Sequence, residues 1–411
     1  MIRALLRELV QSKSLHMAIW IGAGGVALMV ANLIYAYLLK PEEFGFLSLL
    51  QAILSLGVPA APLGFDTLIM RRELGPTDSS IWTATMAILL GAPLFCAVIA
   101  VLYELSFPIV FALTVGCALG AVNRVFVVIY QAEVKLNTAQ AIGQSPTLIF
   151  LLGATLLLIL ENHGLTSAIT WLILSYACSG MIGFVTYRSL PLNPQALAPP
   201  CALTTAERWR RALTFVAIAA SVYVLLQAER LVIPQAMSLA DLATFAVAWS
   251  VVGSPYKLIT AGIGFALMPR LRAASSAKTR RKLVLTELRL AVVLGAISAV
   301  LLIPFGKLVI EQLYGAKYEV TIPLITAIVL SGLVRLTYGV ASAMITALAE
   351  GRELRVLNWS GWLTTAVAIL LAFALSGYGL VGVVVGVTLG WLSKIIIVFL
   401  LLGPSLLSKE E

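Results

Sequence analysis

The chain has 411 residues, of which 60% are hydrophobic and 11% are charged, and its formal net charge at pH 7 is +9. Soluble globular domains are about 45–50% apolar and about 25% charged, so this composition excludes a disordered chain, a disulfide scaffold and a soluble enzyme. It indicates an all-α polytopic membrane protein, in which the location of the charges matters more than their sum.

Twelve apolar runs, most of them close to the roughly 20 residues that a spanning helix requires, follow one another along the chain. The longest polar connection, at about 188–210, contains four prolines and falls midway. It predicts a cytoplasmic linker at 191–210 between an N-terminal six-helix lobe at 1–190 and a C-terminal six-helix lobe at 211–411. The predicted spans are 15–38, 44–66, 81–103, 107–130, 143–160, 165–187, 211–234, 241–268, 283–306, 320–348, 356–376 and 379–402.

The connections between these spans differ in charge from one side of the membrane to the other. Counted from a cytoplasmic N-terminus, one set of connections and termini carries 19 Lys and Arg residues. The other set carries three, namely Lys40, Lys307 and Lys317. Because cytoplasmic loops carry the excess of Lys and Arg, we expect both termini in the cytoplasm.

Short motifs recur in the same order in the two halves. Gly57-Val58-Pro59 in the second span is echoed by Gly253-Ser254-Pro255 in the eighth. Six spans per half is an even number, which predicts two lobes related by a pseudo-two-fold axis along the membrane normal, with a central cavity. Interrupted helices at matching positions point to a substrate site between the halves, although Gly and Pro are also common in spanning helices generally.

Six of the 28 cations fall within or at the margins of the predicted spans, whereas only Asp66 and Glu229 among the 19 acids lie clearly inside. A cation at the bilayer centre costs about 2.5–3.5 kcal/mol on insertion scales, so such residues face a cavity or a partner. Too few acids are present to pair all six, which favours an electropositive cavity with an anionic occupant. The six are Arg124, Arg230, Lys257, Arg289, Arg335 and Lys394.

Four of these cations are predicted to form one layer and to bind the substrate. Arg124, Lys257, Arg335 and Lys394 each lie 15–17 residues into their spans from the external end. At 1.5 Å per residue this is roughly 22–26 Å from the outer boundary. The alternative is that their long side chains extend to the inner interface; Arg289, near the start of its helix, fits that alternative best.

Polar and aromatic side chains at helical spacing accompany the cations and suit a ligand with phosphate and sugar parts, because Arg grips phosphate oxygens bidentately. The same residue types also pack helices together. The expected cavity-lining residues are Tyr223, Gln227, Trp249, Tyr256 and Tyr338. A charge network or coupling site is expected at Asp66, Arg71, Glu229 and Arg230, in which Glu229-Arg230 forms a local pair or binds a coupling ion and Asp66 lies near Arg71.

Motifs for catalysis, metal binding or a cofactor are missing from the sequence. It contains no G-x-x-x-x-G-K-[ST] loop, no H-E-x-x-H and no C-x-x-C pair, and its two histidines lie far apart. We therefore expect no enzyme activity, no metal and no cofactor. Any energy for transport has to come from a gradient, the membrane potential or the substrate supply.

Several short stretches make the chain similar to the polysaccharide transporter (lipid-linked oligosaccharide flippase) family, in the exporter superfamily that includes multidrug antiporters and the lipid II flippase. Two positions depart mildly from the family pattern: Ala243 replaces a usual Gly, and Arg230 follows Glu instead of Asp. The matching stretches are Leu39-Lys40-Pro41-Glu42-Glu43-Phe44-Gly45, Gly64-Phe65-Asp66 with Arg71, Glu229-Arg230, Asp241-Leu242-Ala243-Thr244-Phe245, Met268-Pro269, Leu313-Tyr314-Gly315 with Tyr318, Ala349-Glu350-Gly351-Arg352 and Tyr378-Gly379-Leu380-Val381-Gly382.

The resemblance implies two six-helix lobes around an alternately accessible cavity in a bacterial inner membrane. It implies a flippase that moves an undecaprenyl-pyrophosphate-linked oligosaccharide from the cytoplasmic to the outer leaflet, with a polysaccharide polymerase and chain-length proteins as partners and no nucleic acid. Two other hypotheses stay open. One is a cation-coupled multidrug exporter of the same fold, which needs buried acids. The other is a non-transporting scaffold of a polysaccharide-assembly complex, for which intramembrane cations are costly.

Overall fold

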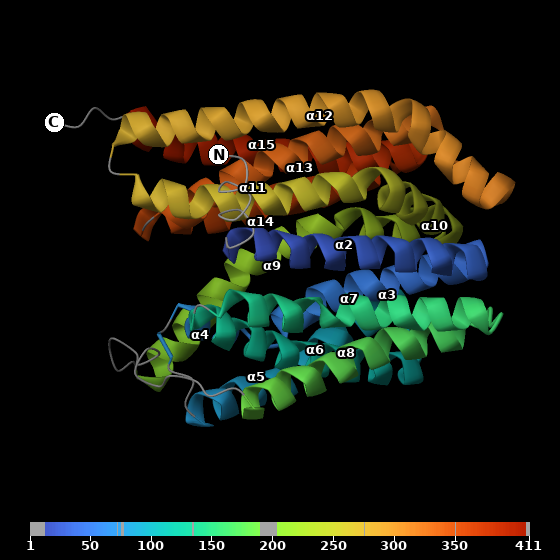
Figure 1. Cartoon of the computed structure of the whole chain (residues 1–411), viewed down its shortest axis with the longest axis horizontal. Coiled ribbons are helices and arrows are strands. Elements are labelled where there is room, and N and C mark those ends of the chain that lie inside the picture. Colours follow the sequence, from blue (N-terminus) through green and yellow to red (C-terminus); the bar gives the residue numbers. More distant parts are fainter. Residues whose placement is uncertain are drawn as a thin grey trace, which may run out of the picture. The chain divides into compact units, whose positions relative to one another are not determined.

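The computed structural model of the chain describes residues 13–71, 73–74, 78–133, 135–189, 204–274, 276–349 and 351–407. The regular elements in these ranges are all helical (Figure 1), as expected where the backbone has to satisfy its own hydrogen bonds in lipid. The α-helices are α2 (Lys13–Leu38), α3 (Pro41–Ala60), α4 (Phe65–Met70), α5 (Asp78–Tyr103), α6 (Phe107–Ala132), α7 (Leu136–Ile159), α8 (Leu165–Ser189), α9 (Thr205–Ala236), α10 (Leu239–Ala248), α11 (Ser254–Ala273), α12 (Ala277–Tyr314), α13 (Ile322–Leu348), α14 (Gly351–Leu375) and α15 (Gly379–Leu407).

These helices account for the twelve predicted spans in the same order, with α3 and α4 in the second span and α10 and α11 in the eighth. Within the described ranges, ten helical stretches are long and apolar enough to cross a membrane, and one of them, Arg352–Gly403, contains both α14 and α15. The remaining span is the run of α10 and α11, joined by a π-helical segment at Trp249–Gly253. The chain is therefore a multi-pass integral membrane protein, and the prediction of about 12 spanning helices is confirmed.

The chain forms two compact units. The first comprises described residues up to Leu39 together with Leu49–Tyr223, and the second comprises Lys40–Ser48 and the residues from Val224 onward. The change of unit therefore falls inside α9, between two consecutive residues of one helix. Of the predicted linker at 191–210, residues 191–203 lie outside the described part of the chain, and the last six residues belong to α9.

Close helix packing holds the first unit together. In Figure 1, α6, α7 and α8 lie side by side, and their mutual contacts agree with that view. Gly116 lies against Leu54 and Ile173, while Gly120 lies against Val58 and Tyr176, so each glycine admits a neighbouring side chain close to the backbone of α6. The Gly116-x-x-x-Gly120 motif therefore serves helix packing.

The second predicted span is broken in the first unit. α3 ends at Ala60, one residue after Pro59, and α4 begins at Phe65. Between them Gly64 adopts φ +87°, and a Cβ there would overlap the carbonyl oxygen of Ala212 in α9. A left-handed backbone and this close approach both require glycine. The predicted interruption of the second span is confirmed.

The eighth predicted span is also interrupted, in the second unit. The π-helical segment at Trp249–Gly253 precedes Pro255, which lies in the first turn of α11. Proline lacks an N–H, so it cannot donate the α-helical hydrogen bond to the preceding turn, and the backbone widens locally. In the same unit α13 packs against α11, α12 and α15, which Figure 1 shows running alongside it.

Candidate functional site

A buried ion pair lies at the centre of the second unit. Arg335 of α13 donates from Nη2 to Oε1 of Glu229 on α9, and the two side chains are 11% and 2% exposed. The two residues are separated by 106 positions in sequence. Burying both charges costs several kcal/mol per ion, so each depends on the other for compensation.

Two indole rings flank the guanidinium of Arg335. Its Cζ lies 4.4 Å from the centroid of the Trp249 ring and 5.6 Å from that of Trp391, within the range of cation–π interactions. Trp249 is the first residue of the π-helical segment, and Gly253 leaves space for its indole, which a Cβ at that position would meet. The interruption of the eighth span thus positions an aromatic face over the buried arginine.

Further cations surround this ion pair. Lys257 lies close enough to Arg230 and Arg335 for their positive charges to repel it. Arg230 is attracted by Glu229 and repelled by Arg335. On α15, Lys394 is 6% exposed, and its Nζ lies 6.0 Å from the ring centroid of Tyr338. The ring centroids of Tyr338 and Trp391 lie 4.7 Å apart, and the Trp391 ring in turn lies beside the guanidinium of Arg335. We call this group the C-terminal charge cluster: Glu229, Arg230, Trp249, Lys257, Arg335, Tyr338, Trp391 and Lys394.

The C-terminal charge cluster has two properties that suit an anionic ligand. Four of its members are cationic and one is acidic, so it carries an excess of positive charge. In addition, Arg335 Nε and Trp391 Nε1 of the cluster, and Ser331 Oγ one turn before Arg335 on α13, are buried and have no hydrogen-bond partner among the described residues. Buried polar atoms are normally satisfied by protein, water or ligand, so these three donors have capacity for an acceptor.

A second ion pair lies in the first unit. Arg124 of α6 donates from Nε to Oδ2 of Asp66 at 2.6 Å, across 58 positions of sequence. Asp66 is the second residue of α4, so the break in the second span places its carboxylate opposite α6. The Asp66 side chain is 3% exposed and that of Arg124 is 33% exposed, with Tyr223 as a further neighbour of the guanidinium. We call Asp66 and Arg124 the N-terminal ion pair.

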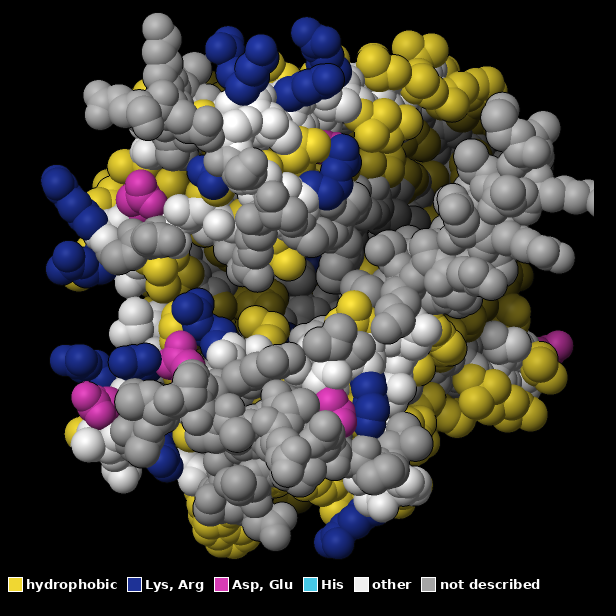
Figure 2. Space-filling view, turned by 60° about the vertical axis from the view of Figure 1, so that its left-hand side comes forward, with side chains coloured by type: hydrophobic (Ala, Val, Ile, Leu, Met, Phe, Trp, Pro, Cys, Tyr) yellow, Lys and Arg dark blue, Asp and Glu magenta, His cyan; other side chains and the backbone are white. Residues whose placement is uncertain are grey.

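Near the N-terminal ion pair, a surface network joins α4 to the start of α9. Glu73 accepts from Arg71 Nε at 3.1 Å and from Arg211 Nη1 at 3.0 Å. Arg71 also lies over the ring of Phe215, 4.9 Å from its centroid. We call Arg71, Glu73 and Arg211 the Glu73 network. In the view of Figure 2, Lys and Arg side chains are more frequent at the surface than Asp and Glu side chains.

The pairing of charges differs from the pairing expected from sequence neighbours. Glu229 forms its ion pair with Arg335, on another helix, and Asp66 pairs with Arg124, while Arg71 pairs with Glu73. Two of the predicted cavity cations are therefore neutralised by the two intramembrane acids. The cause is the tertiary fold, which brings an acid from one span opposite an arginine of another.

Within the C-terminal charge cluster, Lys257 on α11 is exposed. Of the predicted residues outside the cluster, Gln227 is half-buried on α9. Tyr256 is 1% exposed and packs against Gly332 of α13, so it contributes to helix packing. Arg289 is exposed on α12.

Sequence reasoning missed Trp391 and Glu73. Trp391 lies three residues before Lys394 on the same helix, and an aromatic residue at helical spacing from an intramembrane cation is a usable signal. Glu73 follows two arginines, but its partner Arg211 lies 138 residues away, so no local pattern reveals that contact.

Solved structures of transporters share this fold. A multidrug resistance MATE family transporter of the MOP superfamily, in an inward-facing conformation, matches with a TM-score of 0.68 and 15% identity over 95% of this chain and 98% of that one. The lipid II flippase MurJ, inward closed, matches with a TM-score of 0.64 and 10% identity over 93% and 86% of the two chains. A MOP superfamily transporter from Pyrococcus furiosus, described as having a binding pocket of reverse polarity, has a TM-score of 0.56 and 14% identity over 96% and 98%.

These structures are described as transporters or a flippase, and at such identities they establish the fold. No curated protein sequence matches the chain. The sequence profile of a family described as "Polysaccharide biosynthesis protein" matches residues 34–323, which is more than half of the chain. The family resemblance inferred from the short motifs is thereby confirmed, and the chain belongs to this family of polysaccharide biosynthesis proteins.

Proposed function

We propose that the chain is a flippase that moves an undecaprenyl-pyrophosphate-linked oligosaccharide from the cytoplasmic to the outer leaflet of a bacterial inner membrane. The observation that carries the proposal is the C-terminal charge cluster, which gathers four cations and one acid within a membrane-spanning unit. Such an excess of positive charge is costly in a bilayer and requires an anionic occupant or water. Membership of the polysaccharide biosynthesis family supports an occupant that carries sugar.

On this proposal the pyrophosphate binds at Arg335 and Lys394, the two most buried cations that sequence and structure both assign to the cluster. Arginine donates hydrogen bonds from its planar fork to two phosphate oxygens, and lysine supplies a point charge. Glu229 holds Arg335 in place before the anion arrives. It also competes with the anion for the guanidinium, which keeps binding weak enough for release on the other side.

The indoles that flank Arg335 have a further role in this proposal. They fix the plane of the guanidinium. Their apolar faces also exclude water from the site, which strengthens the attraction between the guanidinium and the pyrophosphate. The headgroup changes leaflets by alternating access through a cationic cavity, with both termini in the cytoplasm. The lipid tail stays in the bilayer, and the product goes to a polysaccharide polymerase with its chain-length proteins.

Complementation of a deletion strain tests the proposal. The deletion is expected to accumulate the lipid-linked oligosaccharide and to lose surface polysaccharide. Arg335→Ala and Lys394→Ala are expected to leave both defects in place while the protein remains in the membrane. Arg289→Ala is the matched control, because this cation lies exposed on α12, and it is expected to restore the polysaccharide. Normal polysaccharide with both cluster variants would refute the proposed site.

The likeness to a multidrug resistance transporter supports a second candidate, a cation-coupled drug exporter. Such an exporter needs a buried acid that is available to a cation, whereas Asp66 and Glu229 each bind an arginine. Efflux of a cationic dye from vesicles that is lost in Glu229→Gln would favour this candidate over the flippase.

A further inference from the structure

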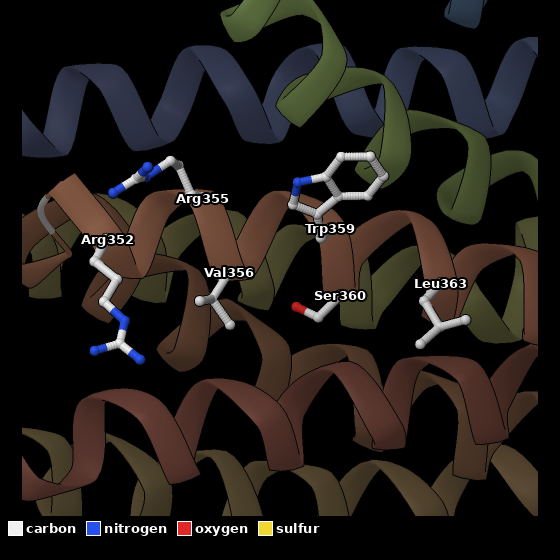
Figure 3. Close-up of a pocket in the computed structure, with 6 residues that line it drawn as sticks. All are labelled: Arg352, Arg355, Val356, Trp359, Ser360 and Leu363. Carbon is white, nitrogen blue, oxygen red and sulfur yellow. The ribbon is translucent and has the colours of Figure 1, made fainter.

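A hollow lies along one face of α14 (Figure 3). It is open to the surroundings, has a volume of about 730 Å³, and is lined by residues of α14 alone. None of the residues of the C-terminal charge cluster lines it. The six residues that do line it, here called the α14 face, are Arg352, Arg355, Val356, Trp359, Ser360 and Leu363.

The α14 face is cationic at one end and mainly apolar along the rest of its length. Figure 3 shows the two arginines toward one end of the row and Leu363 at the other. The axis rises about 16 Å from Arg352 to Leu363. Spacings of three and four residues place these side chains along one stripe of the helix. Trp359 and Leu363 are 79% and 65% exposed, so the apolar part is open to a ligand or to lipid.

The charged end of the α14 face is not neutralised by the acids described near it. Arg352 and Arg355 are exposed, and no ion pair holds either of them among residues 351–407 or the other described ranges. Glu353, in the same turn, does not line the hollow. Extension of one arginine to the interface would account for that arginine alone. It does not account for two arginines, a serine and an exposed indole around one hollow.

We propose that the α14 face docks the pyrophosphate end of a polyprenyl pyrophosphate lipid before its transfer to the C-terminal charge cluster, an inference that rests on the proposed function. Arg352 and Arg355 bind the pyrophosphate oxygens, and Val356, Trp359 and Leu363 contact the start of the isoprenoid chain. Charge complementarity selects this lipid over a phospholipid, because two arginine forks match two linked phosphates better than one.

The test is lipid binding by the full-length protein, measured by native mass spectrometry with sugar-free undecaprenyl pyrophosphate as the probe. The Arg335→Ala/Lys394→Ala background removes both cations that the proposed function assigns to the pyrophosphate in the C-terminal charge cluster, so that the remaining binding reports on α14. There, the added pair Arg352→Ala/Arg355→Ala is expected to weaken binding by at least about tenfold. The matched control, Arg281→Ala/Lys282→Ala, removes two exposed cations at the start of α12 and is expected to change binding by less than about twofold.

A second pair of variants probes the apolar part. Trp359→Ala is expected to weaken binding by about threefold or more, while Trp362→Ala, on the same helix but outside the hollow, is expected to leave it unchanged. A roughly tenfold excess of phosphatidylglycerol is expected not to displace the probe. Undiminished binding after Arg352→Ala/Arg355→Ala would overturn the proposal. So would displacement by phosphatidylglycerol, or occupation of the face by a second copy of the chain.

Failure of the docking site and failure of the proposed function give different results. If the Arg352→Ala/Arg355→Ala variant binds the probe poorly but the deletion strain exports normal polysaccharide, the docking site stands and the flippase function falls. If Arg335→Ala abolishes export but Arg352→Ala/Arg355→Ala binds the probe normally, the flippase function stands and the docking site falls.

Discussion

The two units differ in the surroundings that they give to an intramembrane arginine. Each places one on its fourth span, Arg124 on α6 and Arg335 on α13, and each pairs it with a buried acid. Arg124 is 33% exposed, whereas Arg335 is 11% exposed and lies between two indoles. The first unit therefore pairs Arg124 with one acid, while the second adds Arg230, Lys257 and Lys394 around its ion pair.

This difference assigns different roles to two similar motifs. Asp66 and Arg124 balance each other and leave no net charge for a ligand, so we expect the N-terminal ion pair to serve the packing of α4 against α6 rather than substrate binding. An excess of cations is unfavourable without an anion, so the C-terminal charge cluster is the better candidate for binding. The comparison yields predictions that differ in size between the units.

The largest effect is expected for Arg335→Ala. Removing this guanidinium leaves the Glu229 carboxylate buried without a partner, which costs about 3–5 kcal/mol of stability. Adding Glu229→Gln is expected to restore much of the thermal stability in detergent, because it removes the uncompensated charge, without restoring polysaccharide export. Export by the double variant would show that the pair is structural, as in the first unit.

A smaller effect is expected for Asp66→Asn in the first unit. Arg124 is one-third exposed, so water compensates part of the lost pairing, and we expect a loss of about 1–3 kcal/mol in the free energy of unfolding. The reversed pair Asp66→Arg/Arg124→Asp is expected to regain part of that loss and to keep export. Loss of export in a stable reversed pair would contradict the structural role given to the N-terminal ion pair.

The fold was more predictable from sequence than these pairings. Hydropathy locates the twelve spans because a bilayer demands a fixed length of apolar helix, and Pro59 and Pro255 mark both interruptions because proline lacks a donor. The partner of Asp66 or Glu229 was not predictable, since Arg124 and Arg335 lie 58 and 106 residues away. Local sequence suggested neighbours, but helix packing determines which charges meet.

An effect smaller than that of Asp66→Asn is expected for the indoles of the second unit. Trp249→Leu and Trp391→Leu each remove a cation–π contact worth about 0.5–2 kcal/mol. We therefore expect either variant to lower the initial rate of lipid-linked oligosaccharide transport in proteoliposomes by about 2–30-fold. Trp249→Phe keeps an aromatic face and is expected to lose less than Trp249→Leu. Equal loss in these two Trp249 variants would indicate that indole volume, not the cation–π contact, holds Arg335.

The smallest effect is expected in the Glu73 network, where Arg71 and Arg211 are about half exposed. Surface ion pairs contribute about 0–1 kcal/mol and are screened by salt. Glu73→Gln is therefore expected to lower the thermal midpoint of the detergent-solubilised protein slightly at low salt and not at about 1 M salt. Glu311→Gln, which removes the exposed Lys307–Glu311 pair, is the matched control and is expected to have a still smaller effect. A large, salt-independent loss with Glu73→Gln would mean that the contact between α4 and the start of α9 depends on buried charge, as the second unit does, and the contrast between the two units would weaken accordingly.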